Sequence, residues 1–173
     1  MNPKSLAIAL AGISLVALIV FSTTPTASQS EFTISRTASA DPLLKSFKLG
    51  DGGVMPTNIG PCSTTATYAL TFNTLSFDTG AEPGSQVDIS FDFTSTIDGS
   101  VDQNELVITE NGQQLADLLL DLGDSVTKDQ KYSPDIYLNF PSEIDPGTIT
   151  FESKFNNKDG IVLGCAKFDL IFK

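Results

Sequence analysis

The feature that most constrains the fold is a strict alternation of apolar and polar residues along several segments. The clearest case runs from Gln86 to Phe93, where Val87, Ile89, Phe91 and Phe93 alternate with polar neighbours. A period of two places every apolar side chain on one face of an extended strand. No segment shows a convincing helical period instead. The pattern therefore predicts an all-β protein.

Further segments alternate in the same way: Tyr68–Phe72, Leu75–Phe77, Leu106–Ile108, Ile136–Phe140, Ile149–Phe155 and Ala166–Phe172. Leu115–Leu120 is expected to be the return arm of a hairpin. The change of phase at Asn73-Thr74 predicts a β-bulge. Pro83-Gly84 predicts a turn, and Asn111-Gly112 predicts a tight hairpin, since both residue types tolerate positive φ. Gln114–Asp124 is a helix candidate, but a strand is preferred. About seven strands with frequent turn signals predict a β-sandwich of two antiparallel sheets.

The chain has two cysteines, and they bracket most of the predicted strands. Cys62 precedes the first long apolar segment, and Cys165 lies in the last strand. A disulfide between them ties the first and last strands and closes a loop of about one hundred residues, which the chain-entropy model values at about 4–5 kcal/mol. Such a bond requires an oxidising compartment.

The N-terminus supplies a route to that compartment. After Lys4 the chain is mostly apolar from Leu6 to Phe21, which is typical of a secretory signal peptide. An uncleaved anchor is the alternative, but the segment falls short of the ~20 residues needed to span a bilayer. We expect a signal peptide at residues 1–22, a flexible leader at 23–44 and one domain at 45–173.

Composition excludes several classes of function. The net charge is −11, and no Lys or Arg occurs between Lys48 and Lys128. Such a surface repels nucleic acid, so none is expected as a partner. The chain has no histidine, which removes the commonest general base and metal ligand. We expect neither catalysis, a cofactor nor a metal.

Acidic pairs provide the remaining chemical alternatives. Asp98 with Asp102 and Asp117 with Asp121 are spaced closely enough to suggest the two carboxylates of a glycosidase. Asp98 to Asp102 also has some features of a calcium loop but lacks its spacing. Turn and surface acids are the preferred interpretation of all four residues.

Three landmarks occur in an informative order. They are Cys62 before a strand that leads to Pro83-Gly84, the alternating strand Gln86–Phe93, and Lys131-Tyr132-Ser133 followed at the end by Leu163-Gly164-Cys165-Ala166-Lys167. Over roughly Phe47 to Phe172 the chain resembles the ML lipid-recognition domain family, which includes lysosomal cholesterol carriers and ganglioside activator proteins. It departs from better-known members in having a single cysteine pair.

The resemblance implies an immunoglobulin-like β-sandwich whose sheets part to hold a lipid in an apolar cavity. The implied partners are a sterol, phospholipid or glycolipid and, transiently, a membrane; a lipid-processing enzyme or a receptor is left open. The implied location is outside the cell or in the endolysosomal lumen. The expected cavity residues are the large inward side chains Tyr68, Leu70, Phe72, Phe91, Phe93, Leu106, Ile108, Phe140, Phe151, Phe155 and Phe168.

The entrance is expected near Tyr132–Phe140 and the loop before Ile149, with Tyr132 and Tyr137 offering hydroxyl groups to a headgroup. The second hypothesis is an extracellular adhesion or interaction module with a closed core, tethered by an uncleaved anchor. A Phe91→Arg substitution separates the two hypotheses. It spares the fold if Phe91 faces a cavity and unfolds the domain if Phe91 is packed.

Overall fold

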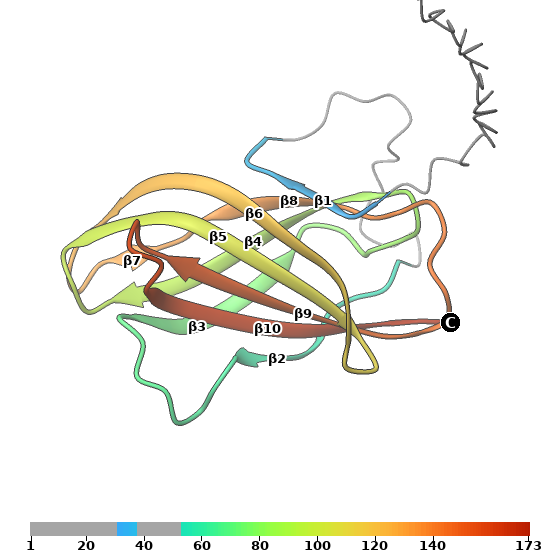
Figure 1. Cartoon of the computed structure of the whole chain (residues 1–173), viewed down its shortest axis with the longest axis horizontal. Helices are drawn as coiled ribbons and strands as arrows, with labels where there is room; N and C mark the ends of the chain where they lie inside the picture. Colours follow the sequence, from blue (N-terminus) through green and yellow to red (C-terminus); the bar gives the residue numbers. More distant parts are fainter. Residues whose placement is uncertain (1–30, 38–52) are drawn as a thin grey trace, which may run out of the picture.

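The computed structural model describes residues 31–37 and 53–173, and these residues form two antiparallel β-sheets packed face to face (Figure 1). The first sheet has the order β1-β8-β4-β3, and β7 also pairs with β4. Its strands are β1 (Thr33–Ser35), β8 (Asp135–Asn139), β4 (Gln86–Ser95), β3 (Leu70–Phe77) and β7 (Lys131–Tyr132). This confirms the predicted all-β sandwich, whereas the cavity between the sheets stays a prediction.

The second sheet has the order β2-β10-β9-β5-β6. Its strands are β2 (Thr57–Pro61), β10 (Val162–Phe172), β9 (Gly147–Asn156), β5 (Gly99–Glu110) and β6 (Gln113–Val126). The expected signal peptide lies outside the described residues. No described segment forms a helix whose length and hydropathy would let it cross a membrane.

Local sequence explains the main strands and their connections. Residues in β4 alternate between buried and half-buried, as the period of two requires. The β3–β4 register shifts between Phe72 and Thr74, which confirms the predicted bulge. Asn111 and Gly112 have φ of 50° and 79° and join β5 to β6 in a tight hairpin. The Gln114–Asp124 segment is therefore a strand.

The N-terminal boundary differs from the expected one. Thr33–Ser35, within the expected flexible leader of residues 23–44, pairs with β8 as strand β1. Phe32 is buried, and its ring lies edge-on to Phe140 and Phe151 at 5.7 and 6.1 Å. The segment is too short to show a clear period, so its structure depends on tertiary pairing. The domain thus includes residues before position 45.

Aromatic rings fill the centre of the sandwich. Phe155 of β9 contacts Phe91 and Phe93 of β4, with ring centroids 5.2 and 5.0 Å apart. Phe151 and Phe168 stack at 4.9 Å on the facing sheet. Distances of this kind are those of optimally packed aromatic pairs. The centre is consequently close-packed, and space for a ligand has to be sought toward the edges.

One disulfide joins Cys62 to Cys165, as expected from the two cysteines. Their Cα atoms are 5.5 Å apart across a sequence separation of 103 residues. Cys62 directly follows β2, so the bond fastens β2 to β10, the last strand. Because β1 precedes β2, the expected link between first and last strands is corrected to a link between the second described strand and the last.

Candidate functional site

The two lateral edges of the sandwich differ in how tightly they close. At one edge β3 contacts β10 and β2. A Cβ atom placed on Gly164 of β10 would lie 2.7 Å from Cβ of Leu70 in β3, so the backbones approach as closely as glycine permits. The two sheets are therefore in direct contact at this point of the edge.

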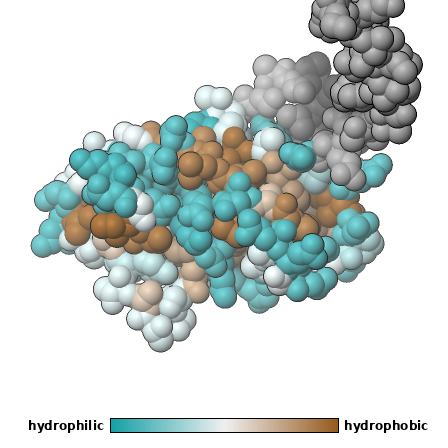
Figure 2. Space-filling view, in the orientation of Figure 1, coloured by the Kyte–Doolittle hydropathy of each residue, from teal (hydrophilic) through white to brown (hydrophobic). Residues whose placement is uncertain are grey.

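The opposite edge lies between β6 and β1, the outermost strand of the first sheet; it is called the β6 edge below. Four inward residues of β6 pack against the core and yet remain half-buried: Ala116, Leu118, Leu120 and Leu122. Figure 1 shows β6 running along the top of the molecule near β1 and β8, and Figure 2 shows hydrophobic surface gathered over that region. The β6 edge is therefore the looser side of the sandwich.

A pocket of about 170 Å³ opens at one end of the β6 edge. Phe32, Leu115 of β6 and Ile149 of β9 supply apolar walls. Glu110, Glu143 and Asp145 give the pocket an acidic lining, and Pro141 and Ile144 complete it. A second pocket, of about 490 Å³, lies on the other side of Ile144 and is lined largely by Val54, Ala81, Pro83, Ile171 and Phe172, together with Glu82 and Lys173.

Both pockets are bordered by the loop before Ile149, through Ile144. This is the loop that was expected to border the entrance. The larger pocket has a size within the roughly 300–1,000 Å³ common for small-molecule sites. That a ligand enters beside this loop remains a prediction.

At its other end the β6 edge is fastened by polar contacts. Arg36, just after β1, forms an ion pair with Asp124 of β6 at 2.7 Å. The Tyr132 hydroxyl donates to the same carboxylate at 2.9 Å. Burial, with the nearby charge of Asp124, raises the pKa of Tyr132, so its hydroxyl stays protonated as a donor. These contacts hold β1 and β7 against β6.

Nine of the eleven expected cavity residues are buried in the core: Leu70, Phe91, Phe93, Leu106, Ile108, Phe140, Phe151, Phe155 and Phe168. Tyr68 precedes β3 and is half-buried, as is Phe72. Their contact with a lipid remains a proposal. Of the two tyrosines expected at a headgroup, Tyr132 is buried against Phe93 and Phe155. Tyr137 is different, because it lies on the outer face of β8 beside Asp88 and not between the sheets.

Three of the four acidic residues noted as pairs in the sequence accept hydrogen bonds that hold the fold. Asp98 accepts a hydrogen bond from the backbone N–H of Lys128, and Asp102 accepts one from that of Lys158. Asp121 accepts one from the Gln103 side chain. Such bonds fix turns and neighbouring strands, which explains these carboxylates without a catalytic role.

Only one group of potential metal ligands occurs among residues 31–37 and 53–173: Cys62, Glu152 and Cys165. Both sulfur atoms of this group belong to the disulfide. Thiolate is the form of cysteine that binds metal, so the group does not suit a metal ion.

Three carboxylates gather on the outer face of the first sheet. Asp88 of β4 lies near Asp78 and Asp135, and its backbone N–H donates to Asp78 Oδ1 at 3.0 Å. Burial is the main cause that raises the pKa of Asp88, and repulsion from Asp135 and Asp78 adds to it. A hydrogen bond from Tyr137 offsets part of this effect. Ionised Asp88 therefore opposes folding.

An Asp88→Asn variant should melt at a higher temperature than the parent protein at pH 7.5. The pKa of Asp88 is raised in the folded state above its ordinary value of 3.8. The parent protein therefore loses stability as pH rises from 3.8 through the raised pKa of the folded state. The advantage of the variant should disappear as pH falls below about 4. Thermal melts at pH 3.5 and 7.5 measure both effects, and an equal difference at the two pH values would contradict this explanation.

Comparisons with known proteins support the fold. No family model and no curated protein matches the sequence. Among solved structures, chicken MD-1 complexed with lipid IVa matches with a TM-score of 0.50 and 13% identity, over 69% of this chain and 96% of that one. A Niemann-Pick type C2 protein from the Japanese carpenter ant matches with a TM-score of 0.48 and 14% identity, over 68% and 100%. The match to MD-1 shows that the chain shares the β-sandwich fold of that protein.

Proposed function

We propose that this protein binds a lipid between its two sheets at the β6 edge and carries or presents it without bond chemistry. The observation that carries the proposal is the asymmetry of the sandwich. At the β3 edge the sheets touch where Gly164 of β10 meets Leu70 of β3, whereas the β6 edge has a half-buried apolar row and a pocket at its end. MD-1, whose fold is similar, was crystallised with lipid IVa. A lipid tail along the β6 row would gain about 25 cal/mol per Å² of apolar surface removed from water.

The dimensions of the β6 edge suit a lipid tail. From Leu115 at the pocket to Leu120 the strand advances about 16 Å, at about 3.3 Å per residue. Phe32 and Ile34, which flank Thr33 of β1, are buried and half-buried beside this edge. A bound tail would lie beneath β1, and loading would require β1 or the loop before Ile149 to move. The disulfide is consistent with action outside the cell or in the endolysosomal lumen.

The first experiment is mass spectrometry of the mature protein, purified without detergent, followed by lipid extraction. One lipid class at near one-to-one stoichiometry would support the proposal. A mass free of lipid, unchanged after incubation with sterol, phospholipid and glycolipid vesicles, would contradict it.

Neighbouring leucines of β6 provide a matched pair of variants. Leu118 belongs to the inward, half-buried row, whereas Leu119 is outward-facing and 61% exposed. Leu118→Gln should weaken lipid binding about tenfold, because it places an amide against the lipid tail. Leu119→Gln should leave binding unchanged. Native mass spectrometry after vesicle incubation measures both, with circular dichroism as the control for folding. Equal affinities in the two variants would place the ligand elsewhere.

An interaction module is the second candidate function. It is favoured by the close-packed aromatic centre and by two exposed leucines on the edge strand, Leu115 and Leu119. In that case Leu119→Gln would weaken the binding of a partner protein, and neither variant would affect lipid capture.

A further inference from the structure

One polar side chain on the inward face of the second sheet has an unused hydrogen-bonding atom. Asn104 of β5 is fully buried and lies on the same face as Leu106 and Ile108. Its cross-strand neighbours are Phe155 of β9 and Leu120 of β6. Leu120 belongs to the half-buried row, so Asn104 lies next to the proposed path of the lipid.

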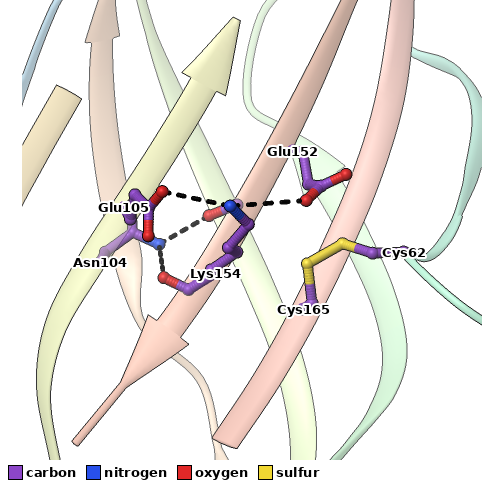
Figure 3. The surroundings of a disulfide bond; sticks show 7 residues. Cys62, Asn104, Glu105, Glu152, Lys154 and Cys165 are labelled. Atoms are coloured by element: carbon purple, nitrogen blue, oxygen red, sulfur yellow. Dashed lines mark hydrogen bonds and ion pairs between the residues drawn. A yellow bond between two sulfur atoms is a disulfide. The ribbon is translucent and has the colours of Figure 1, made fainter. Parts of the chain in front are cut away.

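The orientation of the Asn104 amide is fixed by the two hydrogen bonds that its NH₂ group donates. Nδ2 donates to Ser153 Oγ at 2.7 Å and to the carbonyl oxygen of Lys154 at 3.1 Å (Figure 3). Since a carbonyl oxygen only accepts hydrogen bonds, the NH₂ group must occupy this position. The opposite atom, Oδ1, is then the free end of the amide.

Oδ1 of Asn104 is buried and has no hydrogen-bond partner. A buried acceptor without a partner is costly, because it has lost its hydrogen bond to water, and natural cores rarely leave one in that state. Phe155, the cross-strand neighbour of Asn104, packs against Phe91, Phe93 and Tyr132 of the first sheet, so Asn104 lies beside the aromatic core. A partner for Oδ1 must be a hydrogen-bond donor that tolerates apolar surroundings.

The acidic lining of the 170 Å³ pocket narrows the class of ligand. Glu110, Glu143 and Asp145 line the pocket at the other end of the path. Carboxylates at that point repel phosphate or carboxylate headgroups at neutral pH. A lipid that reaches Asn104 by this route is therefore expected to be uncharged.

We infer that Asn104 Oδ1 accepts a hydrogen bond from the hydroxyl group of an uncharged lipid, such as a sterol or a diacylglycerol. This inference rests on the proposed lipid-binding function and adds a ligand class to it. The lipid hydroxyl replaces the missing partner of Oδ1. A lipid of the same shape without the hydroxyl leaves that atom unpaired.

Matched lipid pairs test the inference on the full-length mature protein. The probes are cholesterol against cholesterol methyl ether and dioleoylglycerol against its O-methyl ether, each presented in neutral phosphatidylcholine vesicles. The protein should bind the hydroxyl member of at least one pair about tenfold more tightly. Vesicles containing phosphatidic acid should donate their anionic lipid less well than either hydroxyl lipid.

An Asn104→Leu/Ser153→Ala variant removes both side chains of the polar pair, so that the Ser153 hydroxyl is not left without its partner. This variant should bind both members of each pair with equal affinity. Lipid binding without hydroxyl preference in the parent protein would overturn the inference, leave the proposed function intact, and assign Oδ1 to a buried water. Failure to bind any probe would instead overturn the proposed function. The hydroxyl preference is measured on the parent protein, so the inference can be tested even if the double variant does not fold.

Discussion

Replacement of Phe91 by arginine should abolish the cooperative folded state. Phe91 is 2% exposed and contacts Phe93 and Phe155 at ring-centroid distances of 6.2 and 5.2 Å. Loss of a buried phenylalanine costs about 3–5 kcal/mol. The guanidinium adds the penalty of an unpaired buried charge. Together these exceed or match the roughly 5–15 kcal/mol of stability of an ordinary domain. Thermal unfolding followed by circular dichroism measures the effect.

A neighbouring position on the same strand supplies the control. Ser90 faces outward, and its hydroxyl donates to Asp135 Oδ1 at 2.7 Å. Arginine at position 90 would lie near the carboxylates of Asp88 and Asp135, so Ser90→Arg should melt within a few degrees of the parent protein. A folded, cooperative Phe91→Arg variant would mean that the ligand space extends to the centre of the sandwich.

The close packing of Phe91 changes what the Phe91→Arg experiment decides. From the sequence alone, unfolding by Phe91→Arg favours a closed interaction module over a lipid carrier. In the structure the ring cluster is packed and the loose region lies at the β6 edge, so unfolding is compatible with both functions. Leu118 and Leu119, which lie on opposite faces of one strand, now separate them.

The strands that were predictable from sequence are those that bury one whole face. In β4 and β10 the alternation is long and regular because each strand lies over the aromatic core. The Asn111-Gly112 hairpin was predictable for a local reason, since its two positive φ angles suit these residues.

β6 was harder, because Leu118-Leu119-Leu120 fits a strand or a helical turn. It is a strand because it pairs with β5 along nearly its whole length. That pairing is a tertiary contact beyond any local pattern. β1 was missed for the same reason, since it depends on register with β8 from a distant part of the chain.

The candidate site was predictable only in its apolar part. Alternation identifies inward phenylalanines but cannot tell a packed ring from one beside a ligand. Asn104 has little sequence signal, because a polar residue between Gln103 and Glu105 is typical of a solvated strand. Its inward position becomes evident only from its burial and from its hydrogen bond to Ser153, 49 residues away in the sequence. The available indication was its position two residues before Leu106 and four before Ile108, in phase with those inward residues.

Removal of the disulfide should have an effect comparable in size to the loss of a core aromatic residue. A Cys62→Ala/Cys165→Ala variant should lose about 4–5 kcal/mol of unfolding free energy, because the bond closes a loop spanning 103 residues. Urea denaturation of the variant beside the oxidised parent protein measures this loss. The parent protein under a reducing agent is the matched control and should shift by a similar amount.

The loss should also have a local component at β2. The side chains of β2 are exposed or half-buried, so this strand adds little to the core and is held by its pairing with β10 and by the disulfide. The ion pairs near the disulfide do not involve β2. Lys154 pairs with Glu105 at 3.1 Å and with Glu152 at 3.7 Å, and all three residues belong to β5 or β9 (Figure 3). Hydrogen exchange in the variant should therefore accelerate first in Thr57–Pro61. Unchanged protection of β2 would show that the backbone ladder alone fixes it, and an unchanged urea midpoint would contradict the entropic role of the disulfide.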